Sequence, residues 1–208
     1  MPYLALIGDI CGSRDLKDRG SVQTQLQQCL NDVNKRYADV LVSPLTITLG
    51  DEFQGLFNNA KKVWEIVFFI DSRLHPTGLR FGFGTGDIST KINTTAAIGM
   101  DGPAFYNARD AMQAVKKNDD NYQIKGLGQD EDLANQILIL ISDTRKKWSA
   151  NRIEVLYALL RGEKVDSIAS GLGISKTAVY KNISDGSLKS IRRILQLLSE
   201  KMDHQLGG

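Results

Sequence analysis

Two aspartates, Asp9 and Asp51, each follow a glycine at the edge of an apolar segment, in positions suited to holding a metal ion. Asp9 lies near the end of the apolar segment 2–10, while Asp51 and Glu52 lie in a short turn between two further apolar segments. Carboxylates held a few ångströms apart repel each other unless a cation lies between them. Mg²⁺ suits such a group because it takes hard oxygen ligands and is completed by substrate phosphates. We therefore predict a Mg²⁺ site at Asp9 and Asp51. The plain alternative is that each Gly-Asp pair only shapes a turn.

The elements that would position these carboxylates follow from the spacing of apolar residues. Segment 2–10 is apolar on both faces, which is typical of a buried central strand. Segments 45–49 and 53–57 are short strand candidates around a Gly-Asp turn, which predicts a hairpin. Segments 21–39 and 63–74 carry apolar residues at helical spacing.

Downstream, the pattern predicts one more strand, a helix and a last strand. Segment 79–88 alternates apolar residues with glycine, which indicates a strand that another backbone approaches closely. Pro103 follows Gly102 and opens a third helix, and residues 122–127 form the last strand. The resulting order, β-α-β-β-α-β-α-β, is typical of an α/β (α+β) fold of the ferredoxin-like palm group.

The overall composition excludes several classes of protein. With 208 residues, 42% hydrophobic and 24% charged, the chain has the make-up of a soluble globular protein. Its apolar runs are too short to cross a membrane, and residues 1–10 lack the features of a secretion signal, so we expect a cytoplasmic protein without membrane contact. Cys11 and Cys29 are too few for a disulfide framework, and two distant histidines make a zinc site or a histidine triad improbable.

Charge divides the chain into two parts. Residues 145–208 carry twelve Lys/Arg against six Asp/Glu, a net charge of +6, whereas residues 1–144 carry fourteen against eighteen, a net charge of −4. A basic C-terminal part indicates a module that faces nucleic acid. The polar stretch 126–132 marks the boundary, so we predict a palm domain over 1–128 and an all-α domain over 129–208. A strand over 137–141 stays open, because its residues are β-branched.

Residues 164–185 have the spacing of a helix-turn-helix. A small Ala169 falls where two helices meet, Gly173 falls where the turn needs a positive φ, and Val179 falls where the second helix packs on the first. The segment is similar to the helix-turn-helix of sigma-factor region four and related regulators. The alternative is a module of the same shape used for protein contacts. Duplex DNA would meet residues of the second helix and a basic cluster after it: Ser175, Lys176, Thr177, Tyr180, Lys181, Lys189, Arg192 and Arg193.

Four sequence blocks taken together resemble the SatD family. They are Gly8-Asp9-Ile10-x-Gly12-Ser13, Gly50-Asp51-Glu52-Phe53-Gln54-Gly55, Arg80-x-Gly82-x-Gly84-x-Gly86, and Ile98-Gly99-Met100-Asp101-Gly102-Pro103-Ala104-Phe105. The N-terminal domain of that family is similar to class III nucleotidyl cyclases and GGDEF diguanylate cyclases, which share the palm. The resemblance implies that Asp9, Asp51 and Glu52 hold metal. It further implies a nucleotide site that includes Gly12, Ser13, Arg80, Asn107 and Arg109.

The chain departs from the cyclase pattern at the positions that read the base and stabilise the transition state. Ile47 stands where class III cyclases have a base-reading Lys, and Leu49 replaces the first Gly of the GGDEF signature. Tyr106 and Asp110 stand where cyclases have an Asn and an Arg four residues apart. Asn107 and Arg109 are only two residues apart, so they point to nearly opposite faces of a helix. These departures favour nucleotide binding without turnover.

The sequence therefore predicts a DNA-binding transcriptional regulator. Its cyclase-like domain would bind a nucleotide, Mg²⁺ or both, or would dimerise, and palm domains that pair head to tail predict a homodimer. One alternative is an active nucleotidyl cyclase or related phosphotransfer enzyme that is regulated through its helix-turn-helix. Another is a protein whose palm is only a scaffold for dimerisation or interaction.

Overall fold

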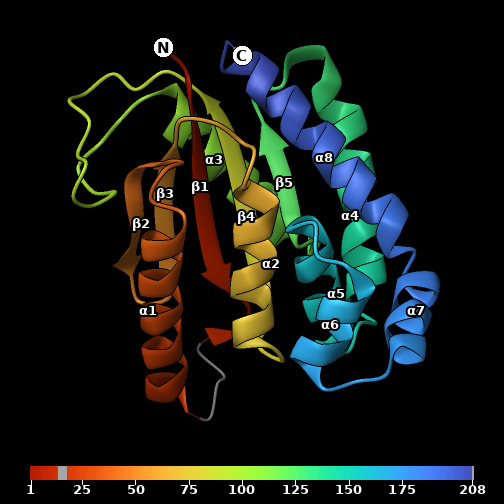
Figure 1. The fold of residues 1–208 in the computed structure, drawn as a ribbon. Coiled ribbons are helices and arrows are strands. Elements are labelled where there is room, and N and C mark those ends of the chain that lie inside the picture. Colours follow the sequence, from red (N-terminus) through yellow and green to blue (C-terminus); the bar gives the residue numbers. More distant parts are fainter. Residues whose placement is uncertain (14–17, 208) are drawn as a thin grey trace.

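The computed structural model describes residues 1–13 and 18–207, and within them five strands form one sheet in the order β2-β3-β1-β4-β5 (Figure 1). Neighbouring strands are antiparallel, except that β4 and β5 are parallel. The central strand is β1, which is buried along almost its whole length, as its doubly apolar sequence predicts. The strands are β1 (Tyr3–Ile10), β2 (Leu41–Leu49), β3 (Glu52–Phe57), β4 (Leu79–Gly86) and β5 (Tyr122–Lys125).

The helices follow the order predicted from the sequence up to β5, and the chain after β5 is helical. The uncertain segment 137–141 lies inside a helix rather than a strand. No described helix is both long enough and apolar enough to cross a membrane. The helices are α1 (Arg19–Arg36), α2 (Val63–Leu74), α3 (Pro103–Asn118), the 3₁₀ helix η2 (Gly128–Asp130), α4 (Glu131–Arg145), α5 (Ala150–Leu160), α6 (Val165–Leu172), α7 (Lys176–Asp185) and α8 (Leu188–Gln205).

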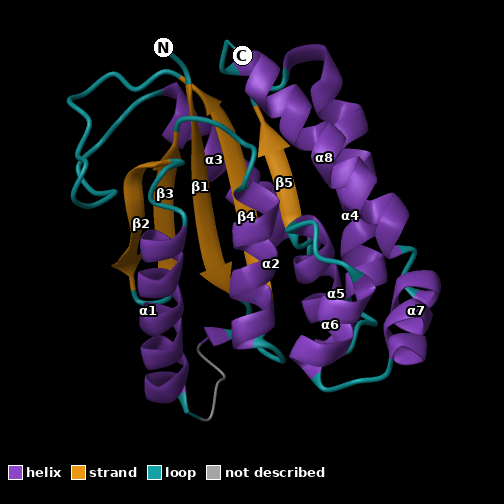
Figure 2. Cartoon of the chain, viewed as in Figure 1, coloured by secondary structure: helices purple, strands orange, loops and turns teal. Residues whose placement is uncertain are grey.

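Helices cover both faces of the sheet (Figure 2). Alternate residues of β1 serve the two faces, because successive side chains of a strand point in opposite directions. Leu4 and Leu6 belong to the large core that α1 and α2 cover. Ala5 and Ile7 belong to a smaller core with α3. The carboxyl end of β1 therefore lies between the two layers of helices.

Strand β4 and helix α3 pack with their backbones in direct contact. A Cβ atom on Gly82 would lie 2.6 Å from the backbone of Ala108, and one on Gly84 would lie 2.2 Å from the same residue. Any larger side chain would push α3 away from the sheet. The close approach predicted from the alternating glycines of β4 is thus confirmed.

The helical C-terminal part packs against the sheet at the β5 side and against α2 (Figure 1). Asp71 of α2 accepts two hydrogen bonds from the guanidinium group of Arg145, which ends α4. The hydrophobic core runs without a break from Phe68 of α2 to Trp148 and Leu156 of the helical part. The two parts consequently share one core.

Helices α6 and α7 are joined by a turn of three residues. Gly173 ends α6 with φ 63°, the left-handed conformation predicted for it. The hydroxyl of Ser175 accepts a hydrogen bond of 3.1 Å from the N–H of Ala178, which makes Ser175 the N-cap of α7. Ala169 and Val179 are buried between the helices. The two helices thus have a fixed relative position.

Candidate functional site

A cleft of about 460 Å³ opens where β1, the β2–β3 hairpin and α3 end. Most of the residues predicted to bind metal or nucleotide lie in it. Among the described residues its lining consists of Asp9, Ile10, Gly12, Ser13, Leu49, Asp51, Glu52, Arg80 and Lys116. Three carboxylates and two cations therefore face one space.

The register of the sheet explains why the carboxylates meet. Gly8 pairs with Phe53 across β1 and β3, so the next residues toward the hairpin, Asp9 and Glu52, lie side by side. Gly50 has φ 64° and makes the tight turn after which Asp51 is placed at the rim of the cleft. The predicted hairpin is confirmed, and it brings the acidic turn to the end of the first strand.

The ammonium group of Lys116 lies between two of the carboxylates. Its Nζ atom is 2.9 Å from Oδ2 of Asp9 and 3.9 Å from Oε2 of Glu52. The Asp9 side chain is 12% exposed, whereas that of Lys116 is 41% exposed, so the lysine reaches in from the solvent side. Lys116 therefore holds the place that a cation shared by Asp9 and Glu52 would take.

Asp51 has a different partner. Its Oδ1 atom lies 3.9 Å from the guanidinium group of Arg19 at the start of α1. Among the described residues, no three acidic, histidine or cysteine side chains are arranged to hold a metal ion by themselves. The predicted three-ligand set is thus divided in this structure, with Asp9 and Glu52 on one cation and Asp51 on another.

The predicted nucleotide-binding residues fall into two groups. Gly12, Ser13 and Arg80 line the cleft, and Arg80 also donates a hydrogen bond of 2.9 Å to Asp119. Asn107 is not among the residues lining the cleft, because it turns toward the sheet and donates its amide N–H to the carbonyl oxygen of Thr85 at 2.8 Å. Arg109 lies on the other side of α3, as the spacing of two residues predicts.

Arg109 lines a second cavity of about 340 Å³ beside the cleft. The two cavities share Leu49, Glu52 and Lys116. Arg109 therefore faces the same cavity as Glu52, one of the carboxylates of the cleft.

A third hollow of about 420 Å³ lies on the other side of the hairpin turn, between α1 and β2. Its lining is polar, with Gln23, Thr24, Gln27 and Gln28 from α1, and Ile47 closes it from β2. The side chain of Gln23 donates a hydrogen bond of 3.1 Å to the carbonyl oxygen of Gly50. The amide groups of α1 thus stand beside the turn that carries Asp51.

The residues at the two cyclase transition-state positions do not line the cleft. The hydroxyl of Tyr106 donates a hydrogen bond of 2.6 Å to Asp101, and this bond raises the pKa of Tyr106. Asp110 is exposed on α3. Neither residue is among the described lining residues of the cleft.

Lys116 is a charged residue of the cleft that the sequence analysis did not single out. The sequence shows it only as part of a polar stretch at the end of a helix. Its position depends on the distance between α3 and the sheet, which Gly82 and Gly84 set. Those glycines were the available signal, because they place α3 directly against the sheet.

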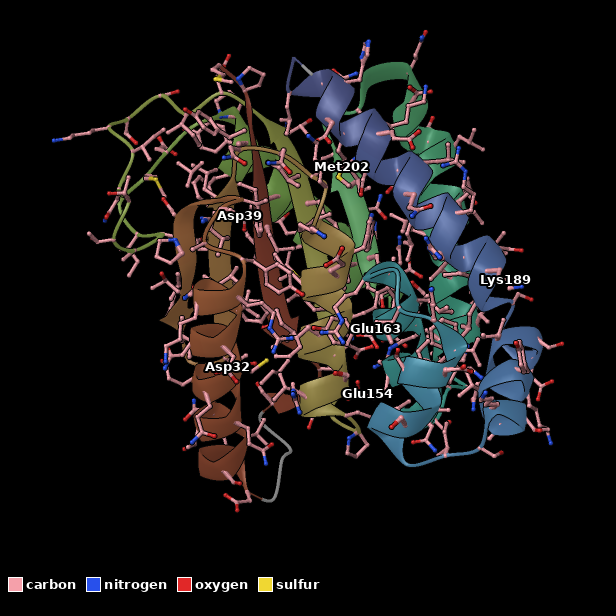
Figure 3. The ribbon with its side chains drawn as sticks, viewed as in Figure 1. Asp32, Asp39, Glu154, Glu163, Lys189 and Met202 are labelled. Atoms are coloured by element: carbon pink, nitrogen blue, oxygen red, sulfur yellow. The ribbon has the colours of Figure 1, made fainter. Side chains whose placement is uncertain are left out.

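Most of the residues predicted to contact DNA are exposed on α7 and α8. Lys176 forms an ion pair of 2.8 Å with Asp166, and this hydrogen bond raises the pKa of Lys176. Tyr180 is 56% exposed, and Thr177 and Lys181 are exposed beside it. Lys189 points outward at the start of α8 (Figure 3). In the same helix Arg192 is half-buried, and Arg193 lies 3.4 Å from Glu200.

The fold and the site together define a mixed α/β protein with a five-stranded sheet and a cleft of mixed charge at its strand ends. Solved structures similar to it are nucleotidyl cyclase domains. The guanylyl cyclase domain of RhoGC from Blastocladiella emersonii, described as monomeric, is 14% identical with a TM-score of 0.43 and covers 54% of this chain and 74% of that one. The guanylate cyclase domain of RhGC from Catenaria anguillulae, in complex with GTP, is 14% identical with a TM-score of 0.41 and covers 54% and 72%.

A bacterial light-regulated adenylyl cyclase is 13% identical with a TM-score of 0.44, and the match covers 59% of this chain but only 42% of that one. No curated protein matches the chain. The SatD family model matches residues 3–197. The chain belongs to the SatD family, as the four sequence blocks predict.

Proposed function

We propose that the cleft binds a nucleoside triphosphate together with a divalent cation, and that the protein catalyses phosphoryl or nucleotidyl transfer from it. The observation that carries the proposal is the position of Lys116, whose ammonium group lies 2.9 Å from Asp9 and 3.9 Å from Glu52. Two carboxylates that share one cation form a site to which a divalent ion can be bound.

The donor atoms of the cleft fit Mg²⁺. Mg²⁺ is held in many phosphate-processing sites by one or two carboxylates, and phosphate oxygens and water complete its coordination. Asp9 and Glu52 supply the two carboxylates, and a triphosphate supplies the remaining oxygens. Mg²⁺ bound there would neutralise the phosphates and polarise the phosphorus that is attacked.

Two cationic side chains are placed to bind the phosphates. Lys116 is 41% exposed and long enough to turn from the carboxylates toward a triphosphate once the divalent ion neutralises them. Arg80 lines the same cleft and presents a planar guanidinium group, which binds phosphate oxygens in pairs. Gly12 has φ 60° at the mouth of the cleft, beside the hydroxyl of Ser13. These residues would orient the triphosphate.

The hollow beside the hairpin turn suits the base. Amide side chains both donate and accept hydrogen bonds, and Gln23 and Gln27 line a space of about 420 Å³ next to Asp51. Ile47 closes the hollow with an apolar surface against which a ring can pack. We assign this hollow to the base, with the triphosphate directed past the turn into the cleft.

Turnover is tested by incubating the protein with ATP or GTP and Mg²⁺ or Mn²⁺ and separating the nucleotides by chromatography. We expect the wild type to convert at least one nucleotide and Asp9→Asn to do so at least ~100-fold more slowly, because Asp9 would hold the ion that stabilises charge in the transition state. Asp39→Asn, an exposed carboxylate away from the cleft, is the matched control. Absence of conversion, or equal conversion by wild type and Asp9→Asn, would contradict the enzymatic part of the proposal.

DNA binding through α7 is the second candidate function, and it stays a prediction. It is favoured by the capped start of α7 and by the exposed side chains of Thr177, Tyr180 and Lys181. Fluorescence anisotropy with duplex DNA over a range of salt concentrations tests it. Replacing Lys176 and Lys181 by Ala should weaken binding and lower the salt slope by about two. Unchanged affinity would exclude α7 as the recognition helix. The predicted homodimer is tested separately by light scattering.

A further inference from the structure

A further cavity, which the proposed function does not use, lies where the α/β layers meet the helical part. It measures about 310 Å³ and is bordered by α1, α2, α5 and α6. We call it the junction cavity. Its charged lining consists of Arg36, Arg73 and Arg161 against Glu154 and Glu163. Figure 3 shows the two glutamates on the side of the helical part that faces α2.

Two of the arginines are held on one aromatic ring. The guanidinium carbon of Arg36 lies 4.8 Å from the centroid of the Phe69 ring, and that of Arg73 lies 5.2 Å from it. The two like charges are therefore at most about 10 Å apart. No described carboxylate lies within ion-pair distance of either group. The guanidinium groups of Arg36 and Arg73 are therefore available to bind an anionic ligand.

The contacts of Arg36 fix its position without neutralising its charge. It donates a hydrogen bond of 2.6 Å to the hydroxyl of Tyr157, which also lies 3.4 Å from the hydroxyl of Tyr37. The guanidinium group of Arg161 lies over the ring of the same Tyr157 and forms an ion pair with Glu163. The cavity is therefore organised before any ligand enters, which lowers the ordering cost of binding.

We propose that the junction cavity binds a small phosphorylated ligand of the nucleoside monophosphate class. Guanidinium groups bind phosphate oxygens through paired, charge-assisted hydrogen bonds, and Arg36 and Arg73 are placed to supply them. Glu154 lines the same space and takes part in no ion pair with a described residue. It is an acceptor for the hydroxyl or amino groups that a nucleoside carries beside its phosphate.

The junction cavity is lined by residues from both the α/β part and the helical part of the chain. Arg36 and Arg73 come from α1 and α2, whereas Ser167, Ile168 and Leu172 come from α6, which leads into the turn before α7. A ligand held there contacts both parts, and it would favour whichever relative position of α6 and α2 fits it best.

Calorimetry of the full chain in EDTA with AMP, GMP, pyrophosphate and adenosine tests the proposal. EDTA removes the divalent ion on which binding in the cleft depends, so the result does not depend on the proposed function. We expect at least one monophosphate to bind and adenosine not to bind, because the phosphate supplies the charge. Arg73→Ala should weaken binding at least tenfold, Arg73→Lys less, and the exposed Lys61→Ala not at all.

Glu154→Gln separates the nucleoside from its phosphate. It should weaken binding of the monophosphate and leave binding of pyrophosphate equal or stronger, since it removes a negative charge. Melting curves with and without ligand check that each variant folds, and binding should raise the midpoint of the wild type by about 3 °C at tenfold saturation. The proposal is overturned if neither AMP nor GMP binds, if adenosine binds as well as AMP, or if folded Arg73→Ala binds as the wild type does.

Discussion

The carboxylate cleft and the Asp71–Arg145 pair use the same kinds of charge in opposite ways. The side chains of Asp71 and Arg145 are 1% and 11% exposed, and the guanidinium group donates two hydrogen bonds to the carboxylate. In the cleft, Lys116 is 41% exposed and Arg19 is 49% exposed; Asp51 and Glu52 each lie 3.9 Å from their cation, and Asp9 lies 2.9 Å from Lys116.

This difference indicates which charges are committed to the fold and which are available to a ligand. A buried pair with two hydrogen bonds cannot separate without leaving an uncompensated charge away from water. A pair whose cation is largely exposed to solvent contributes little and exchanges partners easily. We infer that the Asp71–Arg145 pair fixes α4 to α2, whereas a divalent cation can displace Lys116 from Asp9 and Glu52.

Arg145→Met should give the largest loss of stability. Removing the guanidinium group leaves Asp71 charged and buried, which costs about 3–5 kcal/mol of unfolding free energy. Urea denaturation measures the loss. The exposed pair Lys146–Asp143 is the control, and Asp143→Asn should change stability by less than about 0.5 kcal/mol.

The double variant Asp71→Leu/Arg145→Met sharpens the test. It removes both charges, so we expect it to regain part of the loss. A loss below about 1 kcal/mol in Arg145→Met would mean that the Asp71–Arg145 pair contributes no more than an exposed ion pair. The contrast between the two regions would then be wrong.

Gly84→Ala should have the next largest effect, and it connects the fold to the cleft. The new Cβ atom would lie 2.2 Å from the backbone of Ala108, so α3 must shift, at a cost of about 1–3 kcal/mol. The shift would also move Lys116 away from Asp9. Gly171→Ala is the control, because a Cβ atom there would meet nothing within 4 Å. Alanine is more stable than glycine inside a helix, so this variant should gain about 0.5–1 kcal/mol of unfolding free energy. Equal effects on urea denaturation would show that β4 and α3 are not in tight contact.

Lys116→Met should barely change stability while altering the cleft. The exposed lysine contributes less than about 0.5 kcal/mol through its ion pairs. Its loss leaves Asp9 and Glu52 without their shared cation, so binding of Mn²⁺ in the absence of nucleotide should strengthen about tenfold. Lys117→Met, an exposed neighbour on the same helix, is the matched control. Weaker Mn²⁺ binding in Lys116→Met than in Lys117→Met would argue against competition between lysine and metal.

Ionisation of the Cys29 thiol should have the smallest effect of all, and it should not change the free energy of unfolding near neutral pH. Burial raises the pKa of its thiol from the ordinary 9.0 to about 12. Because the folded-state pKa is raised, any stability linked to the thiol is complete below pH 9 and is lost as the pH rises toward 12. At pH 8.5 iodoacetamide should modify Cys29 on the order of 100-fold more slowly in the folded than in the urea-unfolded protein. Equal rates would mean that the α1 layer opens readily.

Most of the fold could be predicted because its signals are local. The doubly apolar β1, the Gly50 turn of the hairpin and Pro103 at the start of α3 each define an element by nearby residues. The same holds for the cap at Ser175 and the left-handed Gly173. Over 137–141 the β-branched residues left a strand open as an alternative, and the structure has a helix there that packs against β5.

The candidate site could be predicted only in part, because it depends on contacts between distant elements. Asp9 and Glu52 meet through strand register, which the hairpin makes predictable. Asp51 pairs instead with Arg19, and Asn107 bonds to Thr85, since both outcomes depend on how a helix sits on the sheet. Lys116 was missed for the same reason.

Calorimetry with Mg²⁺ and ATP or GTP tests the central claim most directly. The proteins to compare are the wild type, Asp9→Asn/Glu52→Gln and the control Asp39→Asn. The account predicts that the wild type and Asp39→Asn bind at least one of the two nucleotides in the presence of Mg²⁺ and much less in EDTA. It predicts at least tenfold weaker binding by Asp9→Asn/Glu52→Gln. Equal affinity in all three proteins, or binding that does not depend on Mg²⁺, would contradict the assignment of the cleft.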